Sequence, residues 1–558
     1  MEFLDARRLT GPSLLFDSPA AVLDVACTLD EANALEASWR ELVLKMGSAL
    51  GWPEPDFNRV DLDGGVSLAF TAAIDALYAA SAINEWVYAE LSGEPCGDAE
   101  PGFDATLERL RTESAEEANQ RLIELTAEAK RNGVTLLWDD DDVSLGLGRY
   151  SQTFPFRELP ESVDWGDYHD VPIGLVTGTN GKTTTVRLAT HILQGTGKNV
   201  GLSSTDWIAV NDRIIDRGDW SGPGGARAVL REDDVDVAVL ESARGGLLRR
   251  GLGVERADAS LITNIAEDHL GDFGSRSLAE LLEIKWIVSR AVRDSGRLVL
   301  NADDELLVAR ANDYPGEIVW FSIDADNPVI RESLDSGGTA FVLSGDLLSM
   351  RTDSTQEDIC KAGEIPIAMG GAARHNVANA LAASALTWCL GIALEDIAAG
   401  LKSLTQDDNP GRCNLYDVDG RKVLVDFAHN PHAMRTLFDM AAAVPARRRV
   451  LCFGQAGDRP DDLIDRMTRD ASAIGLDRVH VSELAQYHRG REHGEVFDVI
   501  RKALIGEGLA DGDIVHFEEE LEAFDAALQW AEAGDLVIML ALGGAKPVQE
   551  RLGELGAI

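Results

Sequence analysis

The sequence predicts an α/β protein, with a doubly wound, mostly parallel sheet at its centre, an α+β domain before it and a Rossmann-like α/β domain after it. Between residues 171 and 406, strand-like apolar runs alternate with segments long enough to be crossover helices. A glycine-rich loop at 178–183 joins one such strand to one such helix. A polar, proline-containing break at 407–411 precedes a second alternation of the same kind. For 558 residues we therefore expect three domains, at 1–160, 171–408 and 409–558.

The first 160 residues predict an α+β module. Apolar residues recur at three- and four-residue spacings over 29–50 and 105–132, which indicates helices. Short strand-like runs lie between and after them, at 66–70 and 134–138. This region carries no catalytic motif. Three prolines and an acidic, aromatic stretch then mark a linker into the next domain.

The most informative motif is the phosphate-binding loop Gly178-Thr-Asn-Gly-Lys-Thr183. A β-rich run at 171–177 precedes it and a helix pattern at 184–194 follows it, as such a loop requires. Its backbone N–H groups can surround phosphate oxygens, Lys182 can neutralise the outer phosphates, and the Thr183 hydroxyl can reach Mg²⁺. We therefore expect ATP to bind here. The expected contacts are Gly178, Thr179, Asn180, Gly181, Lys182, Thr183 and Thr184.

Two later strand-like runs end in side chains that bind metals. Residues 235–240 lead to Glu241, and residues 259–263 lead to Asp268 and His269. Ligands of doubly wound sheets bind at the carboxyl ends of the strands, and a carboxylate there suits Mg²⁺. Either site alone is compatible with a solvated polar loop, but their repetition at successive strand ends favours a metal site.

Taken together and in their order along the chain, the motifs resemble those of the Mur ligase superfamily. They are the phosphate loop, Glu241, Asn264, Asp268-His269, Lys285, Asn301, His375-Asn376, Asn409-Pro-Gly-Arg412 and Asp426-Phe-Ala-His-Asn-Pro431. Within that superfamily, segments 241–249, 409–414 and 489–495 are similar to the Mur-like half of cyanophycin synthetases. The resemblance covers residues 171 to about 550, and the N-terminal module more faintly resembles the N-terminal domain of those enzymes. Residues 150–170 leave no room for their ATP-grasp domain, so we do not expect a complete polymerase.

The resemblance implies a Mur-type, ATP-dependent carbon–nitrogen ligase. In such a ligase a carboxylate attacks the γ-phosphate of ATP, and an amine then displaces phosphate from the acyl phosphate, leaving ADP and phosphate as by-products. The implied substrates are an amine or amino acid, with arginine and lysine as candidates, and an acceptor that contains aspartate or glutamate. Three alternatives stay open: a Mur-like ligase with another small-molecule acceptor, a regulatory ATP-binding relative without turnover, and a phosphotransferase.

The resemblance also implies roles for individual residues. The implied catalytic residues are Lys182, Glu241, His269 and Lys285. Two Mg²⁺ ions would be held by Thr183, Glu241, His269 and Lys285, the last carbamylated by CO₂; an ordinary helix lysine is the alternative. The nucleotide would also contact Asn301, His375, Asn376, Arg412, Asp426 and His429.

Charged residues elsewhere are candidates for binding the substrates, with plain surface charge as the alternative. The candidates for the amine are Arg489, Arg491, Glu492 and Glu495. The candidates for an acidic acceptor are Arg244, Arg249 and Arg250.

Composition limits the partners and the location. A formal net charge of -44 opposes binding to nucleic acid or to an anionic membrane. Without an apolar run of about 18 residues or a signal-peptide pattern, we expect a soluble, cytoplasmic protein. The six cysteines lack paired spacing, which argues against disulfides or a cysteine zinc site. A salty habitat or simple solubility would each explain the acidic surface, and the resemblance implies a homo-oligomer as one assembly state.

Overall fold

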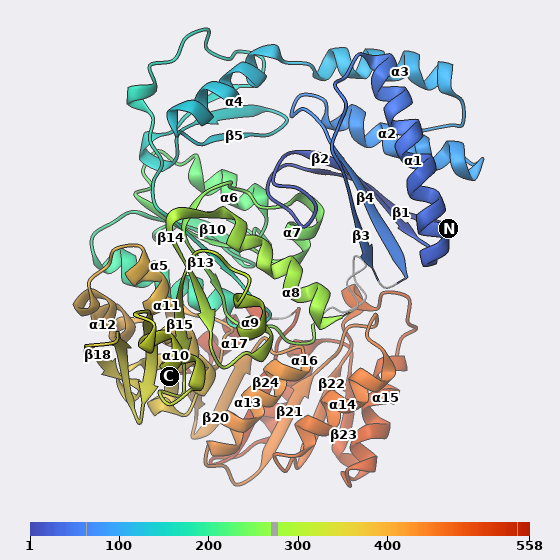
Figure 1. Ribbon diagram of the computed structural model, residues 1–558. Helices are drawn as coiled ribbons and strands as arrows, with labels where there is room; N and C mark the ends of the chain where they lie inside the picture. The colour runs from blue at the N-terminus through green and yellow to red at the C-terminus, as the bar shows by residue number, and fades with distance from the viewer. Residues whose placement is uncertain (63, 269–276, 544, 558) are drawn as a thin grey trace.

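The computed structural model describes residues 1–62, 64–268, 277–543 and 545–557 (Figure 1). Within these residues the strands form four sheets, of 4, 3, 11 and 6 strands. The 4- and 3-stranded sheets fall within residues 1–160, the 11-stranded sheet within 171–408, and the 6-stranded sheet within 409–558. The predicted α/β fold is confirmed, whereas the domain boundaries stay a prediction.

The N-terminal sheet is antiparallel, in the order β1-β2-β4-β3, and helices cover one face. Its strands are β1 (Glu2–Leu9), β2 (Ala20–Ala26), β3 (Phe57–Leu62) and β4 (Gly65–Thr71). Its helices are α1 (Leu29–Leu50), α2 (Leu77–Ser92) and α3 (Phe103–Glu117). Trp39 and Trp86 are fully buried between the layers, and the Trp39 indole donates to Asn84 Oδ1 at 2.8 Å. The Trp39 N–H is thus hydrogen-bonded although the ring is fully buried.

The two long N-terminal helix predictions had different outcomes. Helix α1 spans residues 29–50 as predicted, because Thr28 and Glu31 form a capping box and Gly51 ends the helix in a left-handed conformation. Residues 105–132 are instead divided between α3 and α4 (Gln120–Asn132). The backbone leaves the helical region at Ala118, and the Asn119 side chain caps α4 by accepting from Leu122 N.

A small sheet follows α4 and leads into the central region. Its strands are β5 (Leu136–Trp138), β6 (Asp142–Leu145) and β7 (Gln152–Pro155). Arg231 of the central region reaches this sheet, donating to Asp139 Oδ2 at 2.6 Å and to Ser144 Oγ at 2.7 Å. This small sheet is therefore held against the central region by charged hydrogen bonds.

The central sheet has the order β11-β10-β9-β12-β8-β13-β14-β15-β16-β17-β18. Its strands are β8 (Ile173–Thr177), β9 (Val200–Ser203), β10 (Trp207–Val210), β11 (Arg213–Arg217), β12 (Val237–Glu241), β13 (Ala257–Ile262), β14 (Val292–Asn301), β15 (Glu317–Ser322), β16 (Thr339–Ser344), β17 (Leu347–Arg351) and β18 (Gln356–Lys361). The strands from β9 to β16 in this order pair in parallel, and antiparallel strands form both edges. The middle of the sheet therefore places its strands' carboxyl ends along one edge.

Helices bury both faces of the central sheet. One face packs against α5 (Lys182–Gly195), α11 (Arg374–Cys389) and α12 (Leu394–Ser403). The other face packs against α6 (Pro223–Leu230), α7 (Arg244–Arg250), α8 (Leu278–Trp286), α9 (Glu305–Ala311) and α10 (Pro328–Asp335). This covering explains why the central strands are apolar throughout rather than alternating.

The last sheet has the order β19-β20-β24-β21-β22-β23, with only the β19–β20 pair antiparallel. Its strands are β19 (Asn414–Val418), β20 (Arg421–Asp426), β21 (Arg449–Phe453), β22 (Arg478–Ser482), β23 (Ile514–Phe517) and β24 (Leu536–Leu540). Helices α13 (Pro431–Ala443), α14 (Asp461–Ser472) and α15 (Glu495–Gly506) cover one face. Helices α16 (Glu520–Trp530) and α17 (Ala545–Glu554) cover the other.

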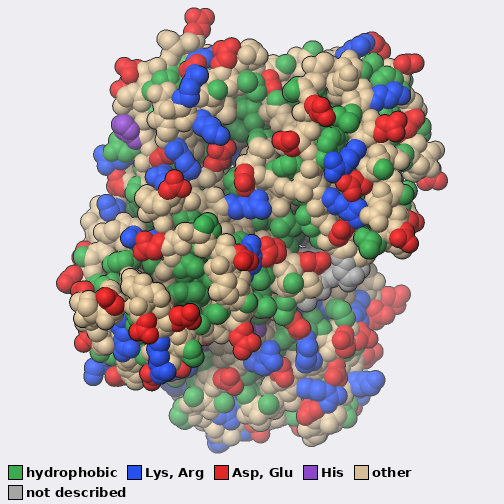
Figure 2. All heavy atoms as spheres, in the orientation of Figure 1, with side chains coloured by type: hydrophobic (Ala, Val, Ile, Leu, Met, Phe, Trp, Pro, Cys, Tyr) green, Lys and Arg blue, Asp and Glu red, His purple; other side chains and the backbone are tan. Residues whose placement is uncertain are grey.

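The surface carries acidic side chains on every part of the face shown in Figure 2, with arginines and lysines among them. Many surface arginines form ion pairs with nearby carboxylates, such as Arg213 with Glu232 and Asp234. Among the described helices, none is both long and apolar enough to cross a lipid bilayer.

Candidate functional site

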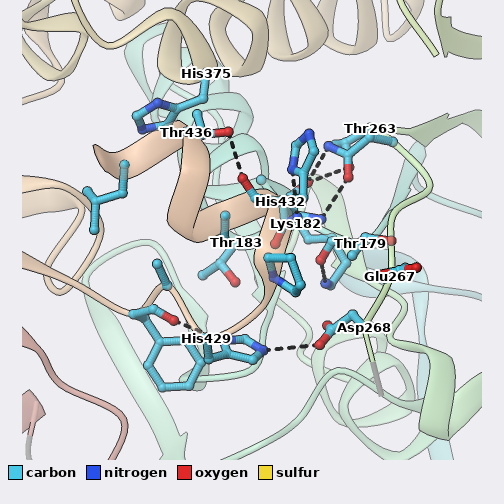
Figure 3. Close-up of a pocket in the computed structure, with 18 of the residues that line it drawn as sticks. Thr179, Lys182, Thr183, Thr263, Glu267, Asp268, His375, His429, His432 and Thr436 are labelled. Atoms are coloured by element: carbon cyan, nitrogen blue, oxygen red, sulfur yellow. Dashed lines mark hydrogen bonds and ion pairs between the residues drawn. The ribbon is translucent and has the colours of Figure 1, made fainter. Parts of the chain in front are cut away.

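A cavity of about 970 Å³ lies between the central and C-terminal sheets. One wall consists of the loop between β8 and α5 and of residues at or after the ends of β12, β13 and β14. The opposite wall comes from residues 412–489, which include the start of α13 (Figure 3). The cavity is thus built by segments that are distant in sequence.

The phosphate loop needs glycine at two positions. Gly178 has a φ of 144°, and a Cβ built there would lie 1.8 Å from Thr263 Oγ1. Gly181 has a φ of 84°, and a Cβ there would lie 2.3 Å from Asn379 Oδ1. Neither position can accept a side chain without moving its neighbour, and the left-handed backbone disfavours one in any case.

The loop is fixed to the end of β13 by short hydrogen bonds. Asn180 N donates to Asn264 Oδ1 at 2.9 Å, and Thr179 N donates to Asn264 O at 2.8 Å. Thr263 Oγ1 donates to Asn180 O at 2.6 Å. These contacts hold the loop in shape before any ligand binds, which lowers the entropy cost of binding.

Oxygen atoms from three elements meet beside the loop. Thr183 Oγ1 donates to Glu241 Oε2 at 3.0 Å, and Thr205 Oγ1 donates to Glu241 Oε1 at 2.7 Å. Thr183 and Glu241 are buried, and Thr205 is partly buried. Hydroxyl and carboxylate oxygens of this kind are the ligands that Mg²⁺ prefers, so the donor set fits that ion.

Two lysines bond to carbonyl oxygens of the same loop. Lys182 Nζ donates to Thr179 O at 2.8 Å, and Lys285 Nζ donates to Gly178 O at 2.7 Å. Lys285, on α8, is only 4% exposed. Burial, and then the nearby Lys182 charge, lower the pKa of Lys285 well below its usual value. The Lys285 ammonium therefore loses its proton more readily than an ordinary lysine does.

The residues predicted to surround the base and ribose line the cavity, namely Asn301, His375 and Asn376. Asn301 Nδ2 donates to Thr263 O at 2.9 Å, and Asn376 Nδ2 donates to Ile367 O at 2.8 Å. Burial, and then the nearby His432, lower the pKa of His375 to about 4, and its Nδ1 is buried without a hydrogen-bond partner in the described part of the chain. His375 is thus a neutral imidazole with one nitrogen free to bond a ligand.

The C-terminal wall touches the phosphate loop directly. Asn430 Nδ2 donates to Asn180 Oδ1 at 2.9 Å, and His432 Nδ1 lies 3.0 Å from Asn180 Nδ2. His429 faces Asp268, with 3.6 Å between Nε2 and Oδ1 (Figure 3). The structure therefore brings the predicted His429 to the strand-end residue Asp268.

A second contact joins the two regions at the start of the C-terminal part. Asp206 Oδ2 lies 2.6 Å from Arg187 Nη2 and 3.4 Å from Arg412 Nη2. The buried Arg187 also donates to Asn409 Oδ1 at 3.0 Å. The predicted Asp426 lies close by, where it accepts from Cys413 N at 2.7 Å and burial raises its pKa. Both predicted residues, Arg412 and Asp426, line the cavity.

The structure separates the candidate substrate residues into two groups. Those in the wall of the cavity are Arg244 and Arg489. Those outside the cavity wall, as far as the chain is described, are Arg249, Arg250, Arg491, Glu492 and Glu495. Arg491 holds the carbonyl oxygens of Gly457 and Arg459, and Glu495 accepts from Glu492 N at the start of α15. His269 lies outside the described residues.

The residues of the site that were missed from the sequence include Arg187, Thr205, Asp206 and His432. His432 follows the Asn430-Pro431 pair that starts α13, so the quoted motif pointed to its position but not to its role. The other three bond to partners far away in the sequence or in loops without a motif. No local pattern reveals such contacts.

Two family models match the chain. The Mur ligase middle domain matches residues 176–387, and the Mur ligase glutamate ligase domain matches residues 411–543. A cyanophycin synthetase from Geminocystis herdmanii is 39% identical over 411 residues, covering 71% of this chain and 46% of that protein. The chain thus spans about half the length of the curated relatives it matches first.

More distant relatives extend the comparison. A UDP-N-acetylmuramoyl-L-alanyl-D-glutamate–2,6-diaminopimelate ligase from Clostridium acetobutylicum is 26% identical, covering 67% of this chain and 73% of that protein. A bifunctional folylpolyglutamate synthase/dihydrofolate synthase, solved with Mn, AMPPNP and L-glutamate bound, superposes with a TM-score of 0.50 at 20% identity. That match covers 68% of this chain and 89% of the solved one, and it shows a shared fold. The chain belongs to the Mur ligase family, whose middle domain and C-terminal glutamate ligase domain it carries.

Proposed function

We propose that this protein is an ATP-dependent amide ligase that joins an amine or amino acid to a carboxylate through an acyl phosphate, releasing ADP and phosphate. The main support is a single cavity that contains a phosphate loop, the Thr183–Glu241 oxygen pair and the buried Lys285. A simple phosphotransferase needs the first two features but has no evident use for a buried lysine with a lowered pKa beside them. The reaction is placed in the cytoplasm, where ATP is available.

The ATP phosphates would lie in the loop 178–183, with Lys182 offsetting their charge. Thr183 and Glu241 would hold Mg²⁺, which when bound would neutralise phosphate charge near the reacting carboxylate. The neutral His375 and the amide of Asn301 would meet the base and ribose. In this family the solved folate enzyme was crystallised with an ATP analogue and Mn, which supports the same assignment.

We further propose that Lys285 reacts with CO₂ to form a carbamate. Its neutral amine would attack the carbon of CO₂, forming an N–C bond and releasing one proton, so that a buried cation site becomes an anion. The carbamate nitrogen keeps one N–H, which can still donate to Gly178 O. The charges of Lys182 and Arg244, which oppose an ammonium at this position, would stabilise the anion.

The two organic substrates would enter from opposite walls. Arg244, on the central wall, suits a carboxylate of the acceptor, while Arg489, on the C-terminal wall, suits the carboxylate of an incoming amino acid. The relative named as a UDP-N-acetylmuramoyl-L-alanyl-D-glutamate–2,6-diaminopimelate ligase supports an amino-acid nucleophile and an acidic acceptor. We favour aspartate- or glutamate-containing acceptors and a basic amino acid.

The test is to incubate the protein with ATP, Mg²⁺, a panel of acidic acceptors and single amino acids, and to identify products by mass. A condensation product formed with equimolar ADP and phosphate is expected. AMP and pyrophosphate would exclude the acyl-phosphate route, and a stable phosphorylated acceptor would indicate a phosphotransferase. ATP binding without any product would favour a regulatory relative. The Lys182→Met variant serves as the control for background hydrolysis.

A further inference from the structure

A second group of ionisable side chains lies in the C-terminal region, outside the cavity. Its members are Glu483, His488, His493, His516 and Glu518. Three of them, Glu483, His493 and His516, each offer a ligand atom, and these atoms all lie within 4.8 Å of one another. The chain has only 10 histidines, so three in one small cluster is a notable concentration. The proposed ligase reaction makes no use of them.

The C-terminal sheet brings this cluster together. Glu483 directly follows β22, and His516 lies on the adjacent parallel strand β23, where it is the register partner of Val481. His493 lies in the turn before α15. Phe497 of α15 stacks on the His516 ring, with 4.2 Å between centroids and 8° between planes, which fixes the orientation of that imidazole.

The central carboxylate is buried and already surrounded by donors. The Glu483 side chain is 5% exposed, and it accepts from His516 Nε2 at 2.7 Å and from Gly494 N at 3.0 Å. His488 Nε2 lies 2.9 Å from its other oxygen. At the outer edge, His493 Nε2 lies 3.0 Å from Glu518 Oε2. The cluster therefore runs from a buried carboxylate to an exposed one through two imidazoles.

We propose that Glu483, His493 and His516 bind a Zn²⁺ ion, with Glu518 beside it as the second carboxylate. Imidazole nitrogens with carboxylate oxygens are a ligand set that Zn²⁺ accepts, whereas Mg²⁺ prefers oxygen ligands alone. Ligand atoms of a tetrahedral zinc site lie about 3.3 Å apart, given bonds of about 2.0–2.1 Å. In the structure, Glu483 Oε1 and His516 Nε2 lie 2.7 Å apart, and all three ligand atoms lie within 4.8 Å of one another, so only small shifts are needed. Two carboxylates and two neutral imidazoles would also balance the charge of the ion.

The ion would fasten the segment 483–494, which forms part of the cavity wall. This segment carries Tyr487 and Arg489 into the cavity, and Tyr487 O accepts from Gly457 N at 2.8 Å. Two ligands, Glu483 and His493, lie at the ends of this segment, and the third, His516, lies on the neighbouring strand. The site is thus a structural one that holds Arg489 in place without touching the nucleotide.

Cysteines are the main competing ligands for zinc, and the structure disfavours them. Burial raises the pKa of Cys96 and Cys360 to about 11, and that of Cys389 to about 12. Zinc binds the thiolate, which is scarce at neutral pH when the pKa is this high.

The test uses the full chain after treatment with EDTA, titrated with ZnCl₂ in the presence of millimolar Mg²⁺. We expect one Zn²⁺ per chain by calorimetry, and slower hydrogen exchange at the amides of 484–494 once zinc is bound. The His493→Ala variant is expected to lose at least tenfold in zinc affinity and the exchange protection. Its side chain is 54% exposed, so this variant should fold normally.

The His191→Ala variant is the matched control, because His191 bonds to Ser403 and lies away from the cluster. It should bind zinc as the parent does. Unchanged affinity in His493→Ala would place the zinc on other residues, such as the cysteines, and would overturn the proposal. So would the absence of zinc binding in the parent, which would leave the cluster as a hydrogen-bond network alone.

Discussion

The carboxamides of Asn180 and Asn430 hydrogen-bond to each other, with 2.9 Å between Asn430 Nδ2 and Asn180 Oδ1. One side chain belongs to the phosphate loop and the other starts α13 of the C-terminal region. The contact therefore joins the two walls of the cavity at the point where the phosphates would lie. Closing the site in this way would keep water away from the proposed acyl phosphate.

The Asn430→Ser variant should lower kcat/KM for ATP by about 3- to 10-fold, the value of one ordinary hydrogen bond. Serine is too short to reach Asn180 but can still cap α13, where Asn430 Oδ1 now accepts from Ala433 N. Steady-state kinetics at saturating acceptor and amine measure the effect. Asn312→Ser, at an exposed position, is the control. A wild-type kcat/KM in Asn430→Ser would mean that this contact does not support catalysis.

The Lys285→Ala variant should lose roughly 100-fold or more of ligase turnover, because it removes the proposed anionic group from a buried, charged site. Added bicarbonate should not restore it, whereas removal of CO₂ should lower the activity of the parent. Product formation measured by mass in sealed, degassed buffer checks both points. The exposed Lys198→Ala variant should match the parent throughout. An active Lys285→Ala variant would eliminate the carbamate from the mechanism.

Arg489 and Glu492 belong to the same loop but differ in position, since only Arg489 lines the cavity. Arg489→Ala should raise KM for the amino acid about tenfold, consistent with one charged hydrogen bond, while KM for ATP stays within twofold. Glu492→Ala is the matched control and should leave both constants unchanged. Initial rates with one substrate varied at a time separate the two values. A raised KM for the amino acid in Glu492→Ala, with no change in Arg489→Ala, would instead assign the amine site to the acidic residues of this loop.

The lowered pKa of Asp535 makes the stability of the fold depend on pH. Burial opposes its charge, but hydrogen bonds from Arg448, the Glu532 amide and Arg447 outweigh that effect and lower its pKa from 3.8 to about 2. Because the folded pKa is depressed, its contribution is complete above about pH 4 and is lost as the pH falls towards 2. This pKa shift corresponds to a contribution of about 2 kcal/mol to the free energy of unfolding.

In urea unfolding at pH 6, the free energy of unfolding of Asp535→Asn should therefore be about 2 kcal/mol lower than that of the parent. This difference should shrink steadily between pH 4 and pH 2. The comparison variant is Asp511→Asn, whose partner Arg501 is exposed, so its deficit should be much smaller. A deficit in Asp535→Asn that does not change with pH would show that packing, rather than charge, explains the loss.

Local signals in the sequence predicted much of the fold. Helix α1 was bounded correctly because its caps, Thr28 and Gly51, are adjacent in sequence to the residues they cap. Strands β8, β12 and β13 of the parallel core were found because burial on both faces makes them continuous apolar runs, whereas β9 and β15 were not named. The edge strands β16–β18 were missed, since an antiparallel meander at a sheet edge lacks the alternation with helices used to find the others.

The site was predictable where residues belong to motifs and not where they act through distant partners. Thr183, Glu241 and Lys285 came from ordered motifs, and the structure brings them to one cavity. The buried Arg187 forms an ion pair with the partly exposed Asp206, and both residues also contact residues more than two hundred positions away. The loop at 489–495 carried the right charges, yet only Arg489 lines the cavity, while Glu492 is exposed outside the cavity wall.

The close approach of Gly178 to Thr263 limits how this sequence can vary. Any larger residue at 178 would need both a smaller residue at 263 and a tolerated left-handed backbone, so two improbable changes would have to occur together. Gly245 is different, because a methyl group there meets no atom within 4 Å. In a randomised library selected for function, we expect position 178 to return only glycine, while position 245 drifts.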